Sequence, residues 1–243
     1  MIKKILILYF ALFTSISFAG QPVDWLVQLE NPRYEIFRLK DDNLLENYLK
    51  YDFSSLLKPE SDFLGFIEPN YRRLKIQFNS VKKNPANNAK YDIKGFSIVK
   101  NNKCDFSGTM TLTQVREYKE MHYGVDDEYK EHGIKAQGIA VANYELHENK
   151  QQKFSGVFEG VMTLYWYKDK NDNLVFDDIE KSVSDNYKNN QYVGTWKQYN
   201  KSKVKIANWG EYRIPYSGGL DIGAGEFGVN PKFYSQGWDE FKQ

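Results

Sequence analysis

The chain has 243 residues, and its 33 basic and 32 acidic side chains leave a formal net charge of +1. This balance excludes the strongly basic surface of a nucleic-acid-binding protein, so we expect no nucleic-acid partner. The 18 Tyr, 16 Phe and 5 Trp residues favour a β-sheet fold, because aromatic side chains suit a pleated, half-buried surface. Cys104 is the only cysteine, which excludes an internal disulfide, and we expect its thiol to be buried.

Residues 1–19 have the three parts of a secretory signal peptide: two lysines near the start, an apolar run over residues 5–13, and the small residues Ser17 and Ala19 before the cleavage site. The apolar run is too short to cross a membrane as a helix. We therefore predict a signal peptide that is cleaved after Ala19, no transmembrane segment in the mature chain, and export to the periplasm or the medium. The mature chain would carry a net charge of −1.

Residues 20–69 form a mixed N-terminal part of the predicted single β-rich domain, which covers residues 20–243. Asp41 and Asp42 precede apolar side chains that share one helical face, namely Leu44, Leu45, Tyr48 and Leu49. An acidic start before a one-faced apolar pattern predicts a short helix here. Pro59 would end any continuation.

Residues 70–209 alternate between apolar and polar side chains and predict a β meander. The expected strands lie near residues 74–79, 91–99, 106–115, 134–146, 154–167, 174–176, 192–199 and 204–209. The highly charged segment 117–132 interrupts the pattern and predicts a long solvated loop. His122 and His132 fall in this loop, where we expect them to be exposed, and their spacing does not match a zinc site.

Three predicted strands begin with an aromatic residue, a spacer and a glycine, as in Phe106-Ser107-Gly108, Phe154-Ser155-Gly156 and Tyr192-Val193-Gly194. Glycine inside a strand often marks a point where a sheet bends. The fold class we predict is mainly β: a single antiparallel curved meander or barrel of about 8–10 strands, with a short N-terminal helix and an irregular C-terminal segment over residues 210–243.

Gly194-Thr195-Trp196 resembles the G-x-W element of lipocalins. The resemblance implies a calycin- or lipocalin-like barrel architecture. In that family the element lies on the first barrel strand, close to the N-terminus. Here it lies near the C-terminal end of the chain, so a whole barrel cannot follow it, and the resemblance extends to no site residue.

Two motifs match known sites in part. Residues 223–228 match G-x-G-x-x-G, but Pro231 blocks the helix that a dinucleotide site needs, so we predict tight loop positions and no cofactor. The second motif places oxygen-bearing side chains at the ligand positions of a calcium loop: Asp169, Asn171, Asn173, Asp177 and Glu180. Leu174 stands where that loop requires glycine, so the alternative is a polar hairpin turn between strands.

The C-terminal segment gathers aromatic and charged residues around glycines, and it supplies the candidate ligand-binding residues Trp209, Glu211, Arg213, Glu226 and Trp238. Aromatic faces can stack on sugars or apolar ligands, while charged groups orient polar ones. The alternative is a structural wrap in which the aromatics anchor the segment and Arg213 pairs with Glu211, Asp221 or Glu226.

Three functions remain open from these residues, and no catalytic motif distinguishes them. The leading hypothesis is a non-enzymatic binding module that holds a small molecule or glycan in an aromatic-lined cavity. A carboxylate-dependent hydrolase that uses Glu211, Asp221 or Glu226 would need two carboxyl groups facing each other across a cleft. A surface or partner-binding protein would show a large exposed apolar patch.

Overall fold

The computed structural model describes residues 20–30, 32, 37–58 and 61–242. The predicted signal peptide lies outside the described residues. The helices are α1 (Gly20–Glu30), α2 (Leu45–Tyr48) and α3 (Ser54–Leu57), with short 3₁₀ turns in the loops. The strands are β1 (Leu64–Ile67), β2 (Arg72–Asn84), β3 (Asn87–Val99), β4 (Asn102–Glu117), β5 (Ala136–Glu148), β6 (Gly156–Lys168), β7 (Leu174–Phe176), β8 (Asn189–Gln198) and β9 (Val204–Glu211).

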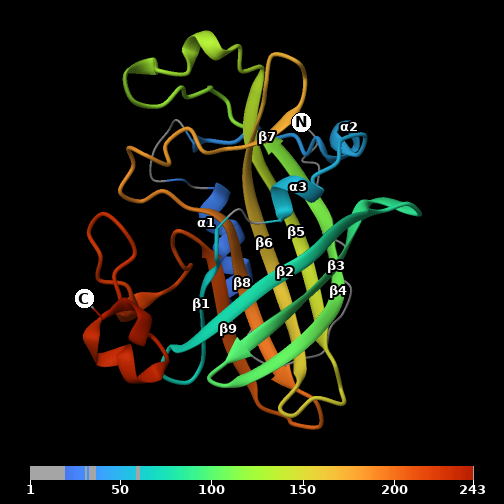
Figure 1. Ribbon diagram of the computed structural model, residues 1–243. Helices are drawn as coiled ribbons and strands as arrows, with labels where there is room; N and C mark the ends of the chain where they lie inside the picture. Colours follow the sequence, from blue (N-terminus) through green and yellow to red (C-terminus); the bar gives the residue numbers. More distant parts are fainter. Residues whose placement is uncertain (1–19, 31, 33–36, 59–60, 243) are drawn as a thin grey trace, which may run out of the picture.

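The sheet closes on itself into a barrel (Figure 1). Its strands follow the order β5-β4-β3-β2-β1-β9-β8-β6, and β6 then pairs with β5 to complete the ring. All pairings are antiparallel, and the short strand β7 extends from β6 outside the ring. The predicted fold class, a mainly β antiparallel barrel with an N-terminal helix, is confirmed. Closure pairs the edges that an open sheet would leave exposed.

Aromatic side chains fill the barrel interior. Trp209 on β9 stacks on Tyr192 of β8 with ring centres 4.8 Å apart, and Tyr144 of β5 meets the Trp209 ring edge-on at 5.1 Å. Gly160 and Gly194 lie opposite each other and leave room for the Tyr144 hydroxyl, since a Cβ at Gly194 would approach that oxygen to 2.3 Å. Glycine in these strands therefore permits close packing inside the barrel.

Helices α2 and α3 pack into the same core at one end of the barrel (Figure 1). Tyr48 of α2 and Leu56 and Leu57 of α3 belong to the main apolar cluster, and Phe53 precedes α3 with no exposed surface. The Phe53 backbone N–H donates to the Tyr91 hydroxyl at 3.1 Å. These contacts close that end of the barrel, and α2 lies where a short helix was predicted after Asp41 and Asp42.

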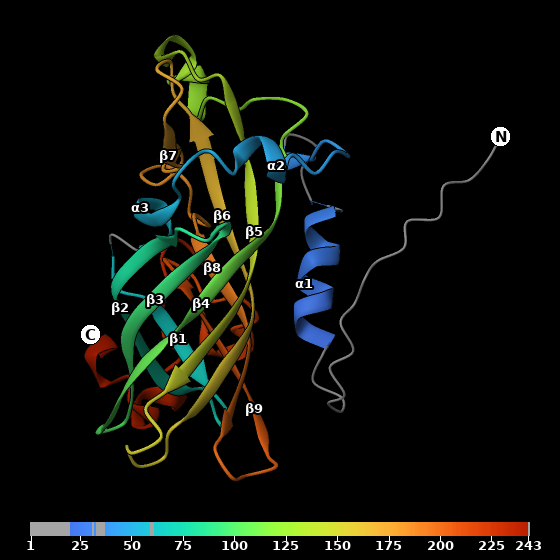
Figure 2. The same cartoon turned by 90° about the vertical axis from the view of Figure 1, so that its right-hand side faces the viewer.

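Helix α1 lies along the outer face of the barrel (Figure 2). Its Trp25 side chain packs against Val161 and Val193, and the indole N–H donates to the Thr163 hydroxyl at 3.3 Å. Val23 and Val27, one turn apart on the same helix, remain 46% and 55% exposed. Within the described residues, no helix has the length and apolar character needed to cross a membrane.

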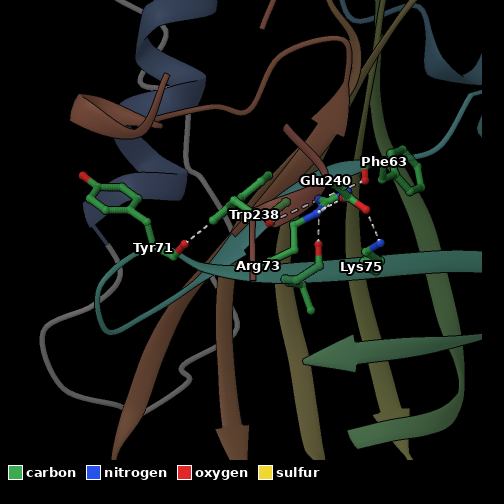
Figure 3. A network of polar contacts seen from close by, with 8 residues as sticks. Phe63, Tyr71, Arg73, Lys75, Trp238 and Glu240 are labelled. Atoms are coloured by element: carbon green, nitrogen blue, oxygen red, sulfur yellow. Dashed lines mark hydrogen bonds and ion pairs between the residues drawn. The ribbon is translucent and has the colours of Figure 1, made fainter. Parts of the chain in front are cut away.

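The C-terminal segment wraps the barrel beside β1 and β2, and one buried arginine fixes it there (Figure 3). The Arg73 guanidinium lies 4.6 Å from the centre of the Trp238 ring, donates to Glu240 at 3.1 Å, and donates to the backbone carbonyls of Phe63 and Leu74. The Trp238 indole donates to the Tyr71 carbonyl at 2.7 Å. An irregular segment gains its order from such anchors.

Candidate ligand groove outside the barrel

A groove of about 1010 Å³ lies between α1, the loop before β8 and the segment that follows β9. It is on the outer side of the barrel, so it is separate from the packed interior. Among the described residues, six aromatic side chains line it: Trp25, Phe37, Tyr118, Tyr165, Tyr187 and Tyr216. Concave sites with apolar walls and a few convergent polar groups are the usual form of small-ligand sites.

Trp25 and Tyr216 form one wall of the groove. Their rings meet edge-on with centres 5.8 Å apart, and Gln28 of α1 donates to the Tyr216 hydroxyl at 3.1 Å. Ile214 and Pro215, just before Tyr216, also line the groove. Contacts between α1 and a segment far along the chain therefore hold this wall together.

A cluster of His122, Asp177 and Glu180 supplies acid–base groups to the groove. The Nδ1 atom of His122 lies 3.6 Å from Glu180 Oε1, and it has no hydrogen-bond partner in the described part of the chain. The imidazole packs edge-on against Phe37 at 5.3 Å. Only 11% of the His122 side chain is exposed, so the expectation of an exposed histidine in the charged loop was wrong. His132 in the same loop is exposed, as expected.

Asp177 is the most perturbed acid of this cluster. Burial raises its pKa to about 6, while the nearby imidazole of His122 lowers it and Asp178 and Glu180 raise it. Its carboxylate accepts from the Ile179 backbone N–H at 3.3 Å. A buried carboxyl that titrates near pH 6 can exchange a proton under mild conditions.

Lys188 contributes a positive charge beside the aromatic wall. Its Nζ lies 5.9 Å from the centre of the Trp25 ring, and it forms no ion pair with any described residue. Its side chain reaches solvent, yet the surrounding protein and the positive charge of Arg213 both lower its pKa. No carboxylate of the described residues therefore neutralises this ammonium.

The floor of the groove includes Gln191, which has no exposed surface. Its amide nitrogen donates to the carbonyls of Asn189, Glu211 and Arg213 at 3.0, 3.3 and 3.0 Å. These bonds fix the orientation of the amide, because only its NH₂ group can donate to carbonyl oxygens. Its Oε1 atom is left without a donor in the described residues.

The predicted ligand-binding residues do not come together in one site. Trp209 is fully buried in the barrel interior, and Trp238 is fully buried in the C-terminal wrap. Glu211 has no exposed surface, and it accepts from Ser61 Oγ at 2.9 Å and from Asn190 Nδ2 at 2.6 Å. Glu226 lies on an exposed loop. Arg213 is the one member of the set that lines the groove.

Arg213 is occupied by structural contacts. It donates to Asp221 at 2.6 Å and to the carbonyls of Asp185 and Gly225. The other oxygen of Asp221 accepts from the N–H groups of Gly223 and Gly228, both at 3.1 Å. The glycines of the G-x-G-x-x-G match are thus tight loop positions, as predicted, and a Cβ at Gly223 would lie 1.8 Å from the Glu226 carbonyl oxygen.

The five residues of the calcium match fall in two different places. Asp169 closes the polar turn between β6 and β7, where it accepts from the N–H groups of Asn171 and Asn173 at 2.9 and 2.8 Å. Asp177 and Glu180 belong instead to the groove. Across the described residues, no group of three or more His, Cys, Asp or Glu side chains is arranged to hold a metal ion.

The groove could not be predicted from the sequence, because its lining residues are scattered along the chain between Trp25 and Tyr216 and no local motif connects them. The one available signal was a histidine between aromatic residues, in Tyr118 to Tyr123, within a loop otherwise rich in charge. Comparison with protein-family models, with curated proteins and with solved structures gives no match for this chain. The groove therefore has to be interpreted from its own chemistry.

Proposed function

We propose that the protein is an exported, non-enzymatic binding module that holds a small molecule or a glycan in the aromatic groove. The observation that carries the proposal is the groove itself, in which six aromatic side chains surround two polar atoms, His122 Nδ1 and Gln191 Oε1, that have no hydrogen-bond partner among the described residues. Aromatic faces bind sugar rings and apolar ligands, and unpaired polar atoms gain hydrogen bonds when a ligand arrives.

The packing of the barrel interior supports an external site. Tyr144, Tyr192 and Trp209 occupy the centre that a ligand would use in a hollow barrel. A ligand there would have to displace closely packed rings, which costs both dispersion contacts and buried apolar area. The external groove requires no such displacement. Export is proposed on the pattern of residues 1–19 alone.

The test is mass spectrometry of protein expressed from the full-length sequence in bacteria and recovered from periplasm and medium. We expect an intact mass that begins at Gly20 and a small molecule that is released when the protein is denatured. Ser184 lines the groove and Ser182 is an exposed residue of the same loop. Ser184→Trp should fill the groove and remove the small molecule, while Ser182→Trp should retain it.

Each part of the proposal can fail separately. A protein found only inside the cell with residues 1–19 attached would contradict export. A wild-type protein that releases no small molecule, or a Ser184→Trp protein that releases as much as the wild type, would contradict ligand binding in the groove. Far-ultraviolet circular dichroism of both tryptophan variants confirms that they are folded.

A further inference from the structure

The charge environment of Lys188 points to the chemical class of the ligand. The ammonium lines the groove, lies over the Trp25 ring, and forms no ion pair within the described residues. The charged neighbour that acts on it is Arg213, which is also positive. The arginine has its own carboxylate, Asp221, at 2.6 Å. Among the described residues, only the arginine of these two cations has a carboxylate partner.

The acidic groups of the groove are engaged elsewhere. Glu180 lies 3.6 Å from His122, and Asp177 is buried and acted on by the same imidazole. Neither carboxylate is among the influences on Lys188. A partly desolvated ammonium favours a ligand anion, since the ligand then compensates a charge that the described residues leave unpaired.

The rest of the groove limits the shape of such a ligand. Trp25 and Tyr216 present ring faces and edges beside the ammonium, so the body of the ligand should be aromatic or aliphatic. At the floor, the Oε1 atom of Gln191 receives no hydrogen bond from the part of the chain that the structure describes. An N–H or O–H group of the ligand that reached this atom, after a small shift of the side chain, would remove an uncompensated buried acceptor.

We propose that the groove binds small apolar or aromatic compounds that carry an anionic group, and that Lys188 is the residue that selects for the anion. This inference rests on the proposed function, because it requires that the groove is a ligand site. A neutral sugar would satisfy the aromatic walls, but it would leave the Lys188 charge uncompensated. The selected class is therefore carboxylates, sulfonates and similar anions with an apolar body.

The experiment compares two fluorescent probes that share an anilinonaphthalene body and its N–H donor. Anilinonaphthalene sulfonate carries a negative charge, and phenylnaphthylamine is the same body without the sulfonate. We expect the sulfonate to bind wild-type mature protein more tightly. In Lys188→Met its dissociation constant should rise about fivefold, as for the loss of one partly solvated charge contact. The phenylnaphthylamine affinity should stay within a factor of about two.

Two further variants separate charge from general surface effects. Lys188→Arg keeps the positive charge and should retain the preference for the sulfonate. Lys205 lies 4.8 Å from the centre of the Trp196 ring and repeats the lysine–tryptophan contact without lining the groove. Lys205→Met should therefore leave both affinities unchanged.

The outcomes distinguish this inference from the function on which it rests. If Ser184→Trp abolishes binding of both probes but Lys188→Met changes neither affinity, the groove binds ligands and the proposed anion selection is wrong. Equal affinities of the two probes for the wild type would lead to the same conclusion. If neither probe binds, or if Ser184→Trp leaves both affinities unchanged, the proposed class of ligand is wrong, whereas the proposed function is decided separately by the small molecule that co-purifies with the wild type.

Discussion

At the scale of single residues, two inward-facing tyrosines differ in what their hydroxyl groups do. Tyr91 is fully buried, and its oxygen accepts the backbone N–H of Phe53 at 3.1 Å. Tyr144 is also buried, at 3% exposure, but its hydroxyl has no hydrogen-bond partner in the described part of the chain. Burial raises the pKa of both groups, so each hydroxyl stays protonated in the folded protein.

This difference predicts opposite effects of the same substitution. Tyr91→Phe should lower the free energy of unfolding by about 1–3 kcal/mol, because it leaves the Phe53 N–H buried without an acceptor. Tyr144→Phe should be neutral or stabilising by up to about 1 kcal/mol, because it removes an unpaired polar atom. Urea unfolding of the two variants measures both values. A loss for Tyr144→Phe as large as for Tyr91→Phe would show that the Tyr144 hydroxyl has a partner.

At the scale of elements, Arg73 is the main contact between the barrel and the C-terminal segment. Its side chain is 7% exposed and connects β2 to Trp238 and Glu240 (Figure 3). Lys75 contacts the same Glu240 at 2.6 Å, but its side chain is 48% exposed. The two cations thus share one carboxylate in very different surroundings.

Arg73→Met should lower the free energy of unfolding by about 3 kcal/mol or more, because the carbonyls of Phe63 and Leu74 lose a buried donor. Lys75→Met should cost less than about 1 kcal/mol, as for an exposed ion pair. Urea unfolding gives the two values, and limited proteolysis should release the C-terminal segment sooner from Arg73→Met. Equal costs for the two variants would contradict the anchoring role of Arg73.

The regular strands could be predicted from the sequence because alternation is a local signal. Leu74, Ile76 and Phe78 face the core as their spacing indicated. The short strand β1 was missed because three of its four residues are buried in succession, which removes the alternation. Helix α1 was missed because it has no acidic first turn and no basic last turn, and its apolar face is recognisable only once β6 and β8 lie beneath it.

The candidate site was less predictable than the fold for a different physical reason. Trp209 and Trp238 are tryptophans, a residue type that often binds ligands. The burial of an aromatic ring stabilises a protein interior in the same way as it stabilises a bound ligand. The sequence does not tell which partner an aromatic residue will meet. Arg213 was correctly given Asp221 as one of three carboxylates, because a nearby acid in a tight loop is a short-range feature.

At the scale of the whole molecule, the barrel depends on closure and packing and not on covalent links. Cys104 is buried and free, as predicted, and burial raises the pKa of its thiol. The ring is completed by twelve paired positions between β5 and β6. The ionisation of buried groups then contributes to the free energy of unfolding, because folding transfers these groups out of water.

Asp177 shows such a contribution to the free energy of unfolding most clearly. Burial raises its pKa to about 6, whereas an unfolded aspartate titrates near 3.9. Between these values the folded chain binds more protons than the unfolded chain, so its stability falls as pH rises from about 4 to about 6. The full effect would be about 3 kcal/mol, a figure that already includes the opposing influence of the His122 imidazole on this pKa.

Asp177→Asn should remove this loss of stability at rising pH, while its side-chain oxygen still accepts from the Ile179 N–H group. The variant should therefore be more stable than the wild type at pH 7, and the difference should shrink towards zero near pH 4. Comparison at each pH is needed because burial also raises the pKa of Glu148, which both proteins retain. Asp178→Asn, at the exposed neighbouring position, removes a charge that raises the pKa of Asp177, so it should weaken the loss of stability with pH without abolishing it. Urea unfolding from pH 4 to 7 measures these differences.

If Asp177→Asn were less stable than the wild type at pH 7, the ionised carboxylate would be a stabilising partner of His122, and the assignment of its raised pKa to burial would be wrong.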